Sequence, residues 1–427
     1  METLSIIRLF YIMYTAYTLF VVSVSDYQIL HAFFGLLAIW LVYLAFGIGY
    51  KTVKPKTEQV LAQETQPEAL FLKISAWKGR TYVLHVLLCW ICTFGASAFY
   101  TGKNVLQVLA ALAKGESLYA SYQRYFAENS IGAFSFSKII FILMLTYTTA
   151  ILFYSFASIL LSKTKITVGK VLFLFLIGGA YLYFGISRGT NFEMYMIFML
   201  LSYCILNRHA ARGGRHKKSK TVIVVAVLGV IMIFAFRIVL TVRGSVFKNT
   251  ICTEIAFDPD SVVATVFPTV TNIGLSVFSY LGYGIYTIGV TVADIFLKSF
   301  PNFLAMLAPG GYGLLCGQSL AAALEETIYV GVHWIPDWIN FVGLLGLPLF
   351  LMVFFLFGRI TARILSSGLP RILVNVCCIF VFLQMISIPI GNFIFTSTPN
   401  LLCVILTIGL CVLYKTILLL FNIKAKN

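Results

Sequence analysis

Charged residues are scarce in this chain. Asp, Glu, Lys and Arg together make up 11% of its 427 residues, whereas they make up about 25% of a typical soluble domain. Hydrophobic residues account for 60%, and the mean hydropathy is +0.94. Too few polar side chains remain to cover a water-exposed surface. The composition therefore excludes an ordinary soluble domain and predicts a polytopic membrane protein.

The sequence also lacks the motifs of soluble, nucleotide-driven enzymes. It contains no Walker motif, no HExxH, no GxSxG and no GxGxxG following a strand. A C-x-x-C pair at 89–92 lies inside an apolar segment, where small buried cysteines are typical of packing rather than of metal or redox chemistry. We therefore expect no metal and no cofactor.

Apolar runs long enough to cross a bilayer recur along the chain. A helix rises about 1.5 Å per residue, so about 20 apolar residues cross a hydrocarbon core of about 30 Å. Because backbone exposed to lipid must satisfy its own hydrogen bonds, we expect an all-α protein with about ten transmembrane helices, in a range of ten to twelve. The expected spans are 5–24, 29–50, 82–100, 138–161, a tight hairpin of 171–187 and 192–207, then 221–241, 338–358, 372–392 and 401–421.

Lys and Arg gather in the connections on one side of this arrangement. Such residues favour cytoplasmic connections, so this side is expected to be the cytoplasm, with both termini facing it. The net charge of +16 is then mainly a signal of orientation. The basic run at 208–220 has no interleaved aromatic residues, so we expect no nucleic-acid binding.

Two segments on the opposite side are too long to be simple turns. They cover 101–137 and 242–337. One integral membrane domain is expected, with an N-terminal bundle at 1–241 that includes the first segment, the large outer loop at 242–337, and a C-terminal three-helix part at 338–427.

The first outer segment has a helical pattern and a stripe of tyrosines. Tyr119, Tyr122 and Tyr125 follow each other at intervals of three residues, which predicts a helix lying on the membrane surface. Such rings anchor at lipid headgroups, or they offer flat apolar faces to sugar rings. The sequence leaves both roles open.

The second outer segment is hydrophobic in its middle part, 261–297, but it is interrupted by Pro268, Gly274, Gly282, Gly284 and Gly289. A single crossing here would place the basic connection after 338–358 outside, where Lys and Arg are disfavoured. We therefore expect re-entrant or interfacial helices, or a paired crossing. Cys252 and Cys316 would form a disulfide in this segment if the compartment is oxidising.

Three arginines lie at the outer ends of spans, where topology disfavours basic residues. They are Arg188, Arg237 and Arg243. Each would reach the headgroups, pair with Glu193, or take part in an anion site. An arginine cannot lose its proton, and its planar fork binds phosphate oxygens bidentately, so together they are candidates for holding a lipid diphosphate.

A histidine and an aspartate precede the span expected at 338–358. A histidine side chain has an unperturbed pKa of about 6.5, so His333 would accept a proton from a sugar hydroxyl. Asp337 would orient it or serve as the base instead, and Trp334 lies beside them at interfacial depth.

These residues resemble a known family, the Wzy-type polymerases of bacterial O-antigen and capsule repeat units, which are related to the O-antigen ligases. The likeness rests on "SRGTN" at 187–191, on "RG" at 243–244, and chiefly on "INFVGLLGLPLFLMVFFLFGRI" at 339–360. The resemblance implies a GT-C-like membrane fold in the bacterial inner membrane, with the active site on its outer face.

The resemblance also implies an activity. A metal-independent, inverting-type glycosyltransferase would move the growing glycan from undecaprenyl diphosphate to the non-reducing end of an incoming lipid-linked repeat unit. A chain-length regulator and a flippase are expected partners, besides membrane lipids. An O-antigen ligase and a lipid-oligosaccharide flippase or other transporter are the alternatives. The implied roles are a base at His333 or Asp337, diphosphate binding by Arg188, Arg237 and Arg243, and sugar binding by Tyr119, Tyr122, Tyr125, Tyr280 and Trp334.

Overall fold

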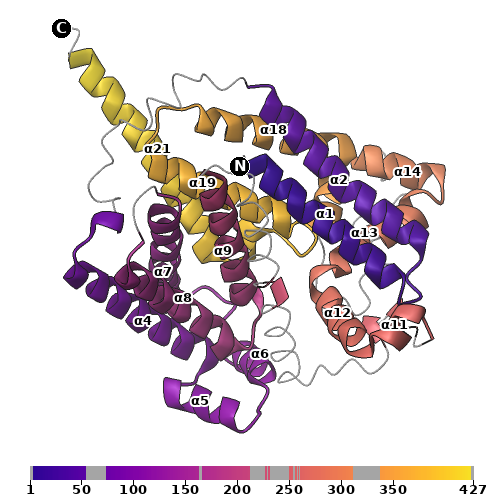
Figure 1. Ribbon diagram of the computed structural model, residues 1–427, viewed down its shortest axis with the longest axis horizontal. Coiled ribbons are helices and arrows are strands. Elements are labelled where there is room, and N and C mark those ends of the chain that lie inside the picture. Colours follow the sequence, from indigo (N-terminus) through magenta and orange to yellow (C-terminus); the bar gives the residue numbers. More distant parts are fainter. Residues whose placement is uncertain are drawn as a thin grey trace.

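Where the computed structural model describes the chain, it is helical apart from one short pairing of strands (Figure 1). Strand β1 (Thr250–Cys252) pairs antiparallel with β2 (Ile255–Ala256). The expected class, an all-α protein with several membrane spans, is confirmed at this level. The described residues are 3–53, 74–162, 166–211, 227, 229–230, 250–252, 255–256, 258, 260–310 and 337–424.

Long helices form the body of the protein, and short ones fill the segments between them. The long helices are α1 (Thr3–Val22), α2 (Ile29–Lys51), α4 (Gly79–Thr101), α7 (Phe136–Leu160), α8 (Val168–Arg188), α9 (Phe192–Ala211), α18 (Leu347–Leu365), α19 (Arg371–Ser387) and α21 (Thr398–Lys424). The short helices are η2 (Ile74–Ala76), α5 (Val105–Ala113), α6 (Leu118–Glu128), α11 (Val262–Val266), α12 (Pro268–Leu281), α13 (Tyr283–Val290), the π-helix η3 (Thr291–Phe296), α14 (Phe300–Leu307), α17 (Asp337–Leu345) and α20 (Phe393–Thr396).

Seven helices in the described ranges are long and apolar enough to cross a membrane: α1, α2, α4, α7, α8, α18 and α21. All except α18 match expected spans closely. Helices α9 and α19 form at two further expected positions, 192–207 and 372–392, but they are not among the helices that are long and apolar enough to cross. Helix α19 is 17 residues long. The span expected at 221–241 lies outside the described residues apart from 227, 229 and 230. The total of about ten spans stays a prediction.

The span predicted at 338–358 is wrong, because the helix breaks at Gly346. Helix α17 ends before this residue and α18 begins after it, with Pro348 in its first turn. Gly346 has φ +78°, a conformation that residues with a side chain rarely adopt. A Cβ atom here would also lie within 3.0 Å of the carbonyl oxygen of Leu307. The break lets the chain pass close to the end of α14.

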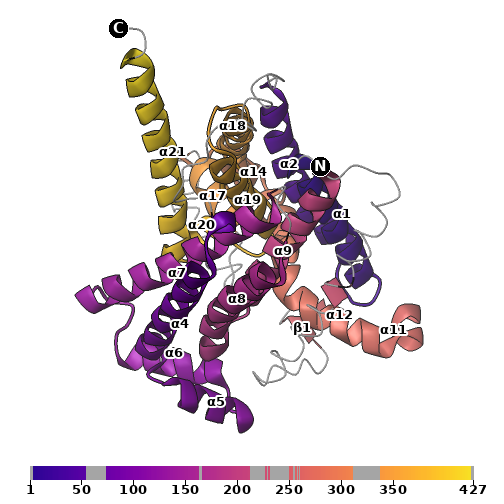
Figure 2. The same ribbon diagram turned by 60° about the vertical axis from the view of Figure 1, so that its left-hand side comes forward.

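Both segments expected outside the membrane contain short helices. The first forms α5 and α6 rather than one surface helix, because the chain turns at Gly115, whose φ is +69°. The second breaks at two of the predicted positions: Pro268 begins α12, and Gly282 separates α12 from α13. The breaks predicted at the other three glycines are wrong, since Gly274 lies inside α12 and Gly284 and Gly289 lie inside α13. Figure 2 shows α5, α6, α11 and α12 toward one end of the protein, opposite the end from which α21 projects.

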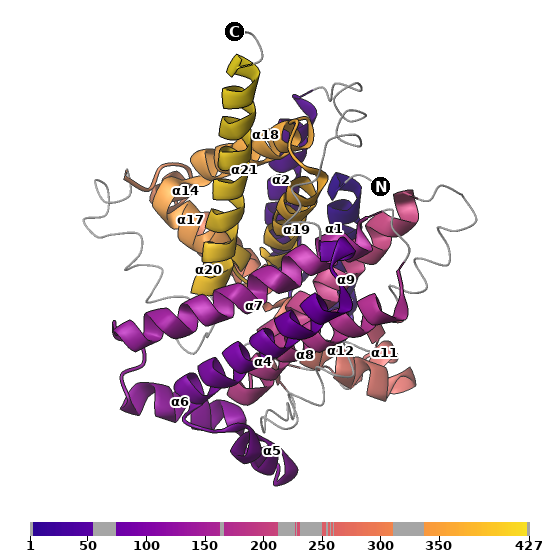
Figure 3. The ribbon, with the colours of Figure 1, turned by 90° about the vertical axis from the view of Figure 1, so that its left-hand side faces the viewer.

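Helices α4, α7 and α8 run side by side and form one part of the body (Figure 3). Helix α2 packs between α13 and α18 in the other part. Its contact with α13 is a close approach of two backbones at glycine. A Cβ on Gly35 would lie within 3.0 Å of the carbonyl oxygen of Ile285, and a Cβ on Gly289 would lie equally close to the carbonyl oxygen of His31. Small residues at helix contacts allow such approaches in membrane proteins.

The contact between α2 and α18 is also a close approach of two backbones at glycine. A Cβ on Gly49 would lie within 3.0 Å of the carbonyl oxygen of Phe355, and a Cβ on Gly358 would meet that of Phe46 at a similar distance. Because the neighbouring atoms belong to the backbone, neither contact can relax by a change of rotamer. These glycines therefore hold α2 in place between its two neighbours.

Helix α19 lies at the centre and is buried along most of its length. Its carboxyl end has carbonyl groups without helical partners, and side chains of other helices donate to them. The hydroxyl of Tyr11 donates to Met385 at 2.9 Å. The hydroxyls of Tyr14 and Tyr195 donate to Ile386 at 2.9 and 3.3 Å. Tyrosines of α1 and α9 thus satisfy a helix end inside the protein.

The chain between α19 and α21 is largely non-helical and mostly buried. Its backbone is satisfied by polar side chains: Gln384 Oε1 accepts the N–H of Ile394 at 3.1 Å, and the amide of Asn400 donates to the carbonyl of Phe393 at 3.2 Å. Irregular backbone at membrane depth is tolerated where protein surrounds it.

The glycine contacts give a test of the packing. Replacing Gly358 with Ala places a methyl group against the backbone of α2, and we expect a loss of about 1–3 kcal/mol in the free energy of unfolding. Gly409 of α21 has nothing within 4 Å of an added Cβ, so Gly409→Ala is the matched control and should not lower stability. Thermal unfolding in detergent measures both. Equal stability of the two variants would rule out the close contact.

Candidate functional site

The turn between α8 and α9 is formed by the sequence Ser-Arg-Gly-Thr-Asn at 187–191. Gly189 ends α8 in the left-handed conformation, with φ +65°. The N–H of Thr190 then donates to the carbonyl oxygen of Gly185 at 2.9 Å, as is usual at helix ends capped by glycine. A Cβ on Gly189 would lie within 3.0 Å of the backbone nitrogen of Tyr119. Glycine therefore serves both the turn and the close approach of α6.

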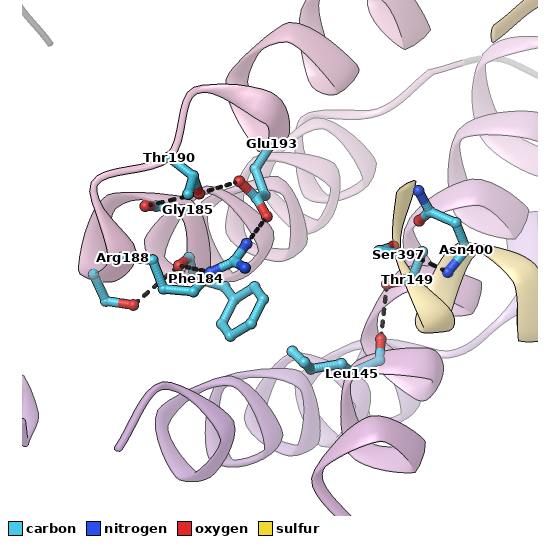
Figure 4. A network of polar contacts seen from close by, with 10 residues as sticks. Leu145, Thr149, Phe184, Gly185, Arg188, Thr190, Glu193, Ser397 and Asn400 are labelled. Atoms are coloured by element: carbon cyan, nitrogen blue, oxygen red, sulfur yellow. Dashed lines mark hydrogen bonds and ion pairs between the residues drawn. The ribbon is translucent and has the colours of Figure 1, made fainter. Parts of the chain in front are cut away.

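Arg188 and Glu193 form an ion pair across this turn (Figure 4). A terminal nitrogen of Arg188 donates to Oε1 of Glu193. Thr190 Oγ1 donates to the other carboxylate oxygen at 2.8 Å. The side chain of Arg188 is 18% exposed and that of Glu193 is 5% exposed. Of the alternatives open for Arg188, the structure shows pairing with Glu193, and the arginine side chain is the more exposed of the two.

Two aromatic rings contact the guanidinium of Arg188. Its Cζ lies 4.0 Å from the ring centre of Phe184, and the Nε donates to the Phe184 carbonyl oxygen at 3.4 Å. The ring of Tyr122 lies 5.8 Å from the same atom. A cation within about 6 Å of a ring centre is attracted to the ring face. Arg188 is thereby fixed between a residue of its own helix and one of α6.

Helix α6 places the tyrosine stripe against the ends of α4 and α8. Ser117 caps the helix by accepting the N–H of Ala120 at 3.3 Å. The backbone of Tyr119 lies on the α8–α9 turn, and a Cβ on Gly102 would lie within 3.0 Å of the Tyr125 ring. All three tyrosines are partly buried. Two of them dock α6 on the bundle, and Tyr122 faces the arginine between them.

The remaining predicted site residues are less fully described. Helix α17 begins at Asp337, and Tyr280 lies near the end of α12. For these two residues the structure describes the backbone and not the side chain. Cys252 lies in β1. Arg237, Arg243, Cys316, His333 and Trp334 lie outside the described residues. The structure thus brings together Arg188 and the three tyrosines.

Sequence reasoning missed two members of this site and one separate ion pair. Phe184 and Thr190 contact the Arg188–Glu193 pair; the spacing of four residues between Phe184 and Arg188 on one helix could have indicated the first. His31 of α2 lies 3.0 Å from Asp294 of η3. No local pattern indicates that contact, because it depends on how α13 and η3 pack on α2.

The site combines groups suited to a polar ligand with a flat apolar face. It offers N–H donors of Arg188, a carboxylate whose charge is already balanced, and the ring of Tyr122. Within the described ranges, no group of three or more His, Cys, Asp or Glu side chains is arranged to hold a metal ion.

Comparison with known proteins gives no further assignment. No protein family, no curated protein and no solved structure matches this chain.

The ion pair gives a test by single and double substitution. Arg188→Met leaves the nearly buried Glu193 carboxylate without its partner, and we expect a loss of about 3–5 kcal/mol in the free energy of unfolding. The double variant Arg188→Met/Glu193→Met buries no charge and should recover most of that loss. Melting temperatures in detergent would rank the variants. A double variant as unstable as the single one would show that the two charges do not compensate each other.

Proposed function

We propose that this protein is a membrane glycosyltransferase that polymerises lipid-linked oligosaccharide repeat units, as the Wzy-type polymerases do. It would act on the outer face of a bacterial inner membrane, in a GT-C-like fold. A hydroxyl of the incoming repeat unit attacks the anomeric carbon of the growing glycan. The bond to undecaprenyl diphosphate breaks, the diphosphate leaves, and the hydroxyl proton passes to a base of the protein.

One observation carries the proposal most directly: an arginine and an aromatic ring lie together where long apolar helices end. Arg188 closes α8, a candidate membrane span, and Tyr122 of the short helix α6 lies over it. A lipid-linked glycan keeps its polyprenyl chain in the bilayer and its sugars at the boundary. Polar donors and a ring face at this boundary suit such a substrate.

The other roles in the reaction fall to residues named from the resemblance. Arg237 and Arg243 would hold the diphosphate, and His333 or Asp337 would be the base. The substrate itself carries the leaving group, so the reaction needs no nucleotide sugar. Arg188 belongs to the diphosphate group in the resemblance, but Glu193 already balances its charge.

A lipid-oligosaccharide transporter is the second candidate function. It is favoured by the buried, largely non-helical chain between α19 and α21, whose backbone is satisfied by polar side chains. Broken helices inside the membrane are typical of transporter binding sites. Such a protein would move the same lipid-linked substrate without lengthening it.

Purified protein in proteoliposomes distinguishes the two functions. The substrate is the cognate undecaprenyl-diphosphate repeat unit, with no nucleotide sugar present, and product length is followed on a gel. We expect a ladder of lipid-linked polymer that Tyr122→Leu weakens by about fivefold, because a stacked ring contributes about 1 kcal/mol to binding a flat ligand.

Arg124→Gln is the control for that assay, since Arg124 lies on α6 but is exposed to solvent; it should leave the ladder unchanged. Movement of substrate between leaflets without any ladder would instead support the transporter. If the substrate is neither lengthened nor moved between leaflets, both proposals are contradicted.

A further inference from the structure

The Arg188 site is close to electrically neutral. Glu193 makes an ion pair with Arg188, and the described contacts include no second basic side chain at this pair. A diphosphate ion would have to approach a carboxylate that is held directly beside the arginine. The attraction of the one charge and the repulsion of the other largely cancel at such short separation. The pair is therefore poorly suited to a multiply charged anion.

Neutral hydrogen-bond acceptors remain well suited to it. A guanidinium has five N–H donors. One donates to Glu193 and one to the carbonyl oxygen of Phe184, and the other three have no acceptor in the described part of the chain. The side chain is 18% exposed, so part of it is open to a ligand. Hydroxyl groups accept such hydrogen bonds without bringing a charge.

The ring of Tyr122 supplies the second element of a sugar site. It lies 5.8 Å from Cζ of Arg188 and is partly exposed. Its position is fixed from both sides, because Tyr119 rests on Gly189 and Tyr125 rests on Gly102 along the same helix. A rigid aromatic face beside fixed N–H donors loses little conformational entropy when it binds a ligand.

We propose that Arg188, Glu193 and Tyr122 bind a neutral sugar ring of the lipid-linked glycan rather than its diphosphate. The identification of the ligand as a glycan rests on the proposed function. The sugar contacts the Tyr122 ring through its C–H face and accepts hydrogen bonds from Arg188 through its hydroxyls. Glu193 keeps the guanidinium oriented and its charge balanced, and so acts as a positioning residue.

Binding can be measured without any polymerisation. The purified full-length protein in nanodiscs is mixed with methyl glycosides of glucose, galactose, mannose, rhamnose and N-acetylglucosamine, and saturation-transfer NMR detects contact with each. Inorganic pyrophosphate is the anionic probe, followed by the width of its phosphorus signals. At least one glycoside should receive saturation from the wild-type protein. Pyrophosphate broadening caused by Arg237 and Arg243 should be the same in Arg188→Gln as in the wild type.

The variants then separate the roles. Tyr122→Leu and Arg188→Gln should each reduce transfer to the bound glycoside by about threefold or more. Glu193→Gln keeps the shape of the side chain but removes its charge, so the phosphorus signals of pyrophosphate should now be broader than with the wild type. The exposed Arg124→Gln variant is the matched control and should change neither signal.

Two results would overturn the proposal. One is pyrophosphate binding to the wild type that disappears in Arg188→Gln, since Arg188 would then hold an anion. The other is no transfer to any glycoside, or transfer that Tyr122→Leu leaves unchanged. If the protein binds the glycoside at this site but makes no polymer, the sugar-site proposal stands and the polymerase proposal fails. The two proposals can therefore fail separately.

Discussion

A chain that crosses a bilayer must satisfy its own polar groups, because the hydrocarbon offers no hydrogen-bond partners. The rest of the structure depends on this constraint. It makes the fold helical, and it explains why the helix end at Ile386 receives tyrosine hydroxyls from α1 and α9. It also explains why Glu193, which lies nearly buried beside the helix ends, has both carboxylate oxygens engaged. The proposed ligand site therefore consists of an ion pair, Arg188–Glu193, and the N–H groups of Arg188 that have no acceptor in the described part of the chain.

The candidate site follows from that constraint and from close helix packing. Gly189 lets α6 approach the α8–α9 turn, and this approach brings Tyr122 to Arg188. The arginine is therefore not an isolated cation at the membrane surface. It is one side of a balanced pair, covered by helix α6 and partly exposed. The chemistry that suits it is recognition of hydroxyl groups more than capture of phosphate.

The sequence allowed the helical class, most span positions and the α8–α9 hairpin to be predicted, because apolar length is a local property of the chain. It also indicated Arg188, Glu193 and the tyrosine stripe, because their positions at span ends and their spacing can be read locally along the chain. It did not predict the break at Gly346, since that glycine resembles many others until its contact with Leu307 is known. Nor could it show that Tyr122 lies over Arg188 or that His31 meets Asp294, because helix packing sets those distances.

The proposed function requires the α6-covered Arg188 site to face the outside of the cell membrane, where lipid-linked glycans would reach it. Labelling with a membrane-impermeant maleimide tests this most directly. Arg124→Cys marks α6, and Gly368→Cys marks the connection between α18 and α19; both positions are exposed, and wild-type protein gives the background. In intact spheroplasts, we expect the maleimide to label Arg124→Cys at once and Gly368→Cys only after permeabilisation. The reverse pattern would contradict it.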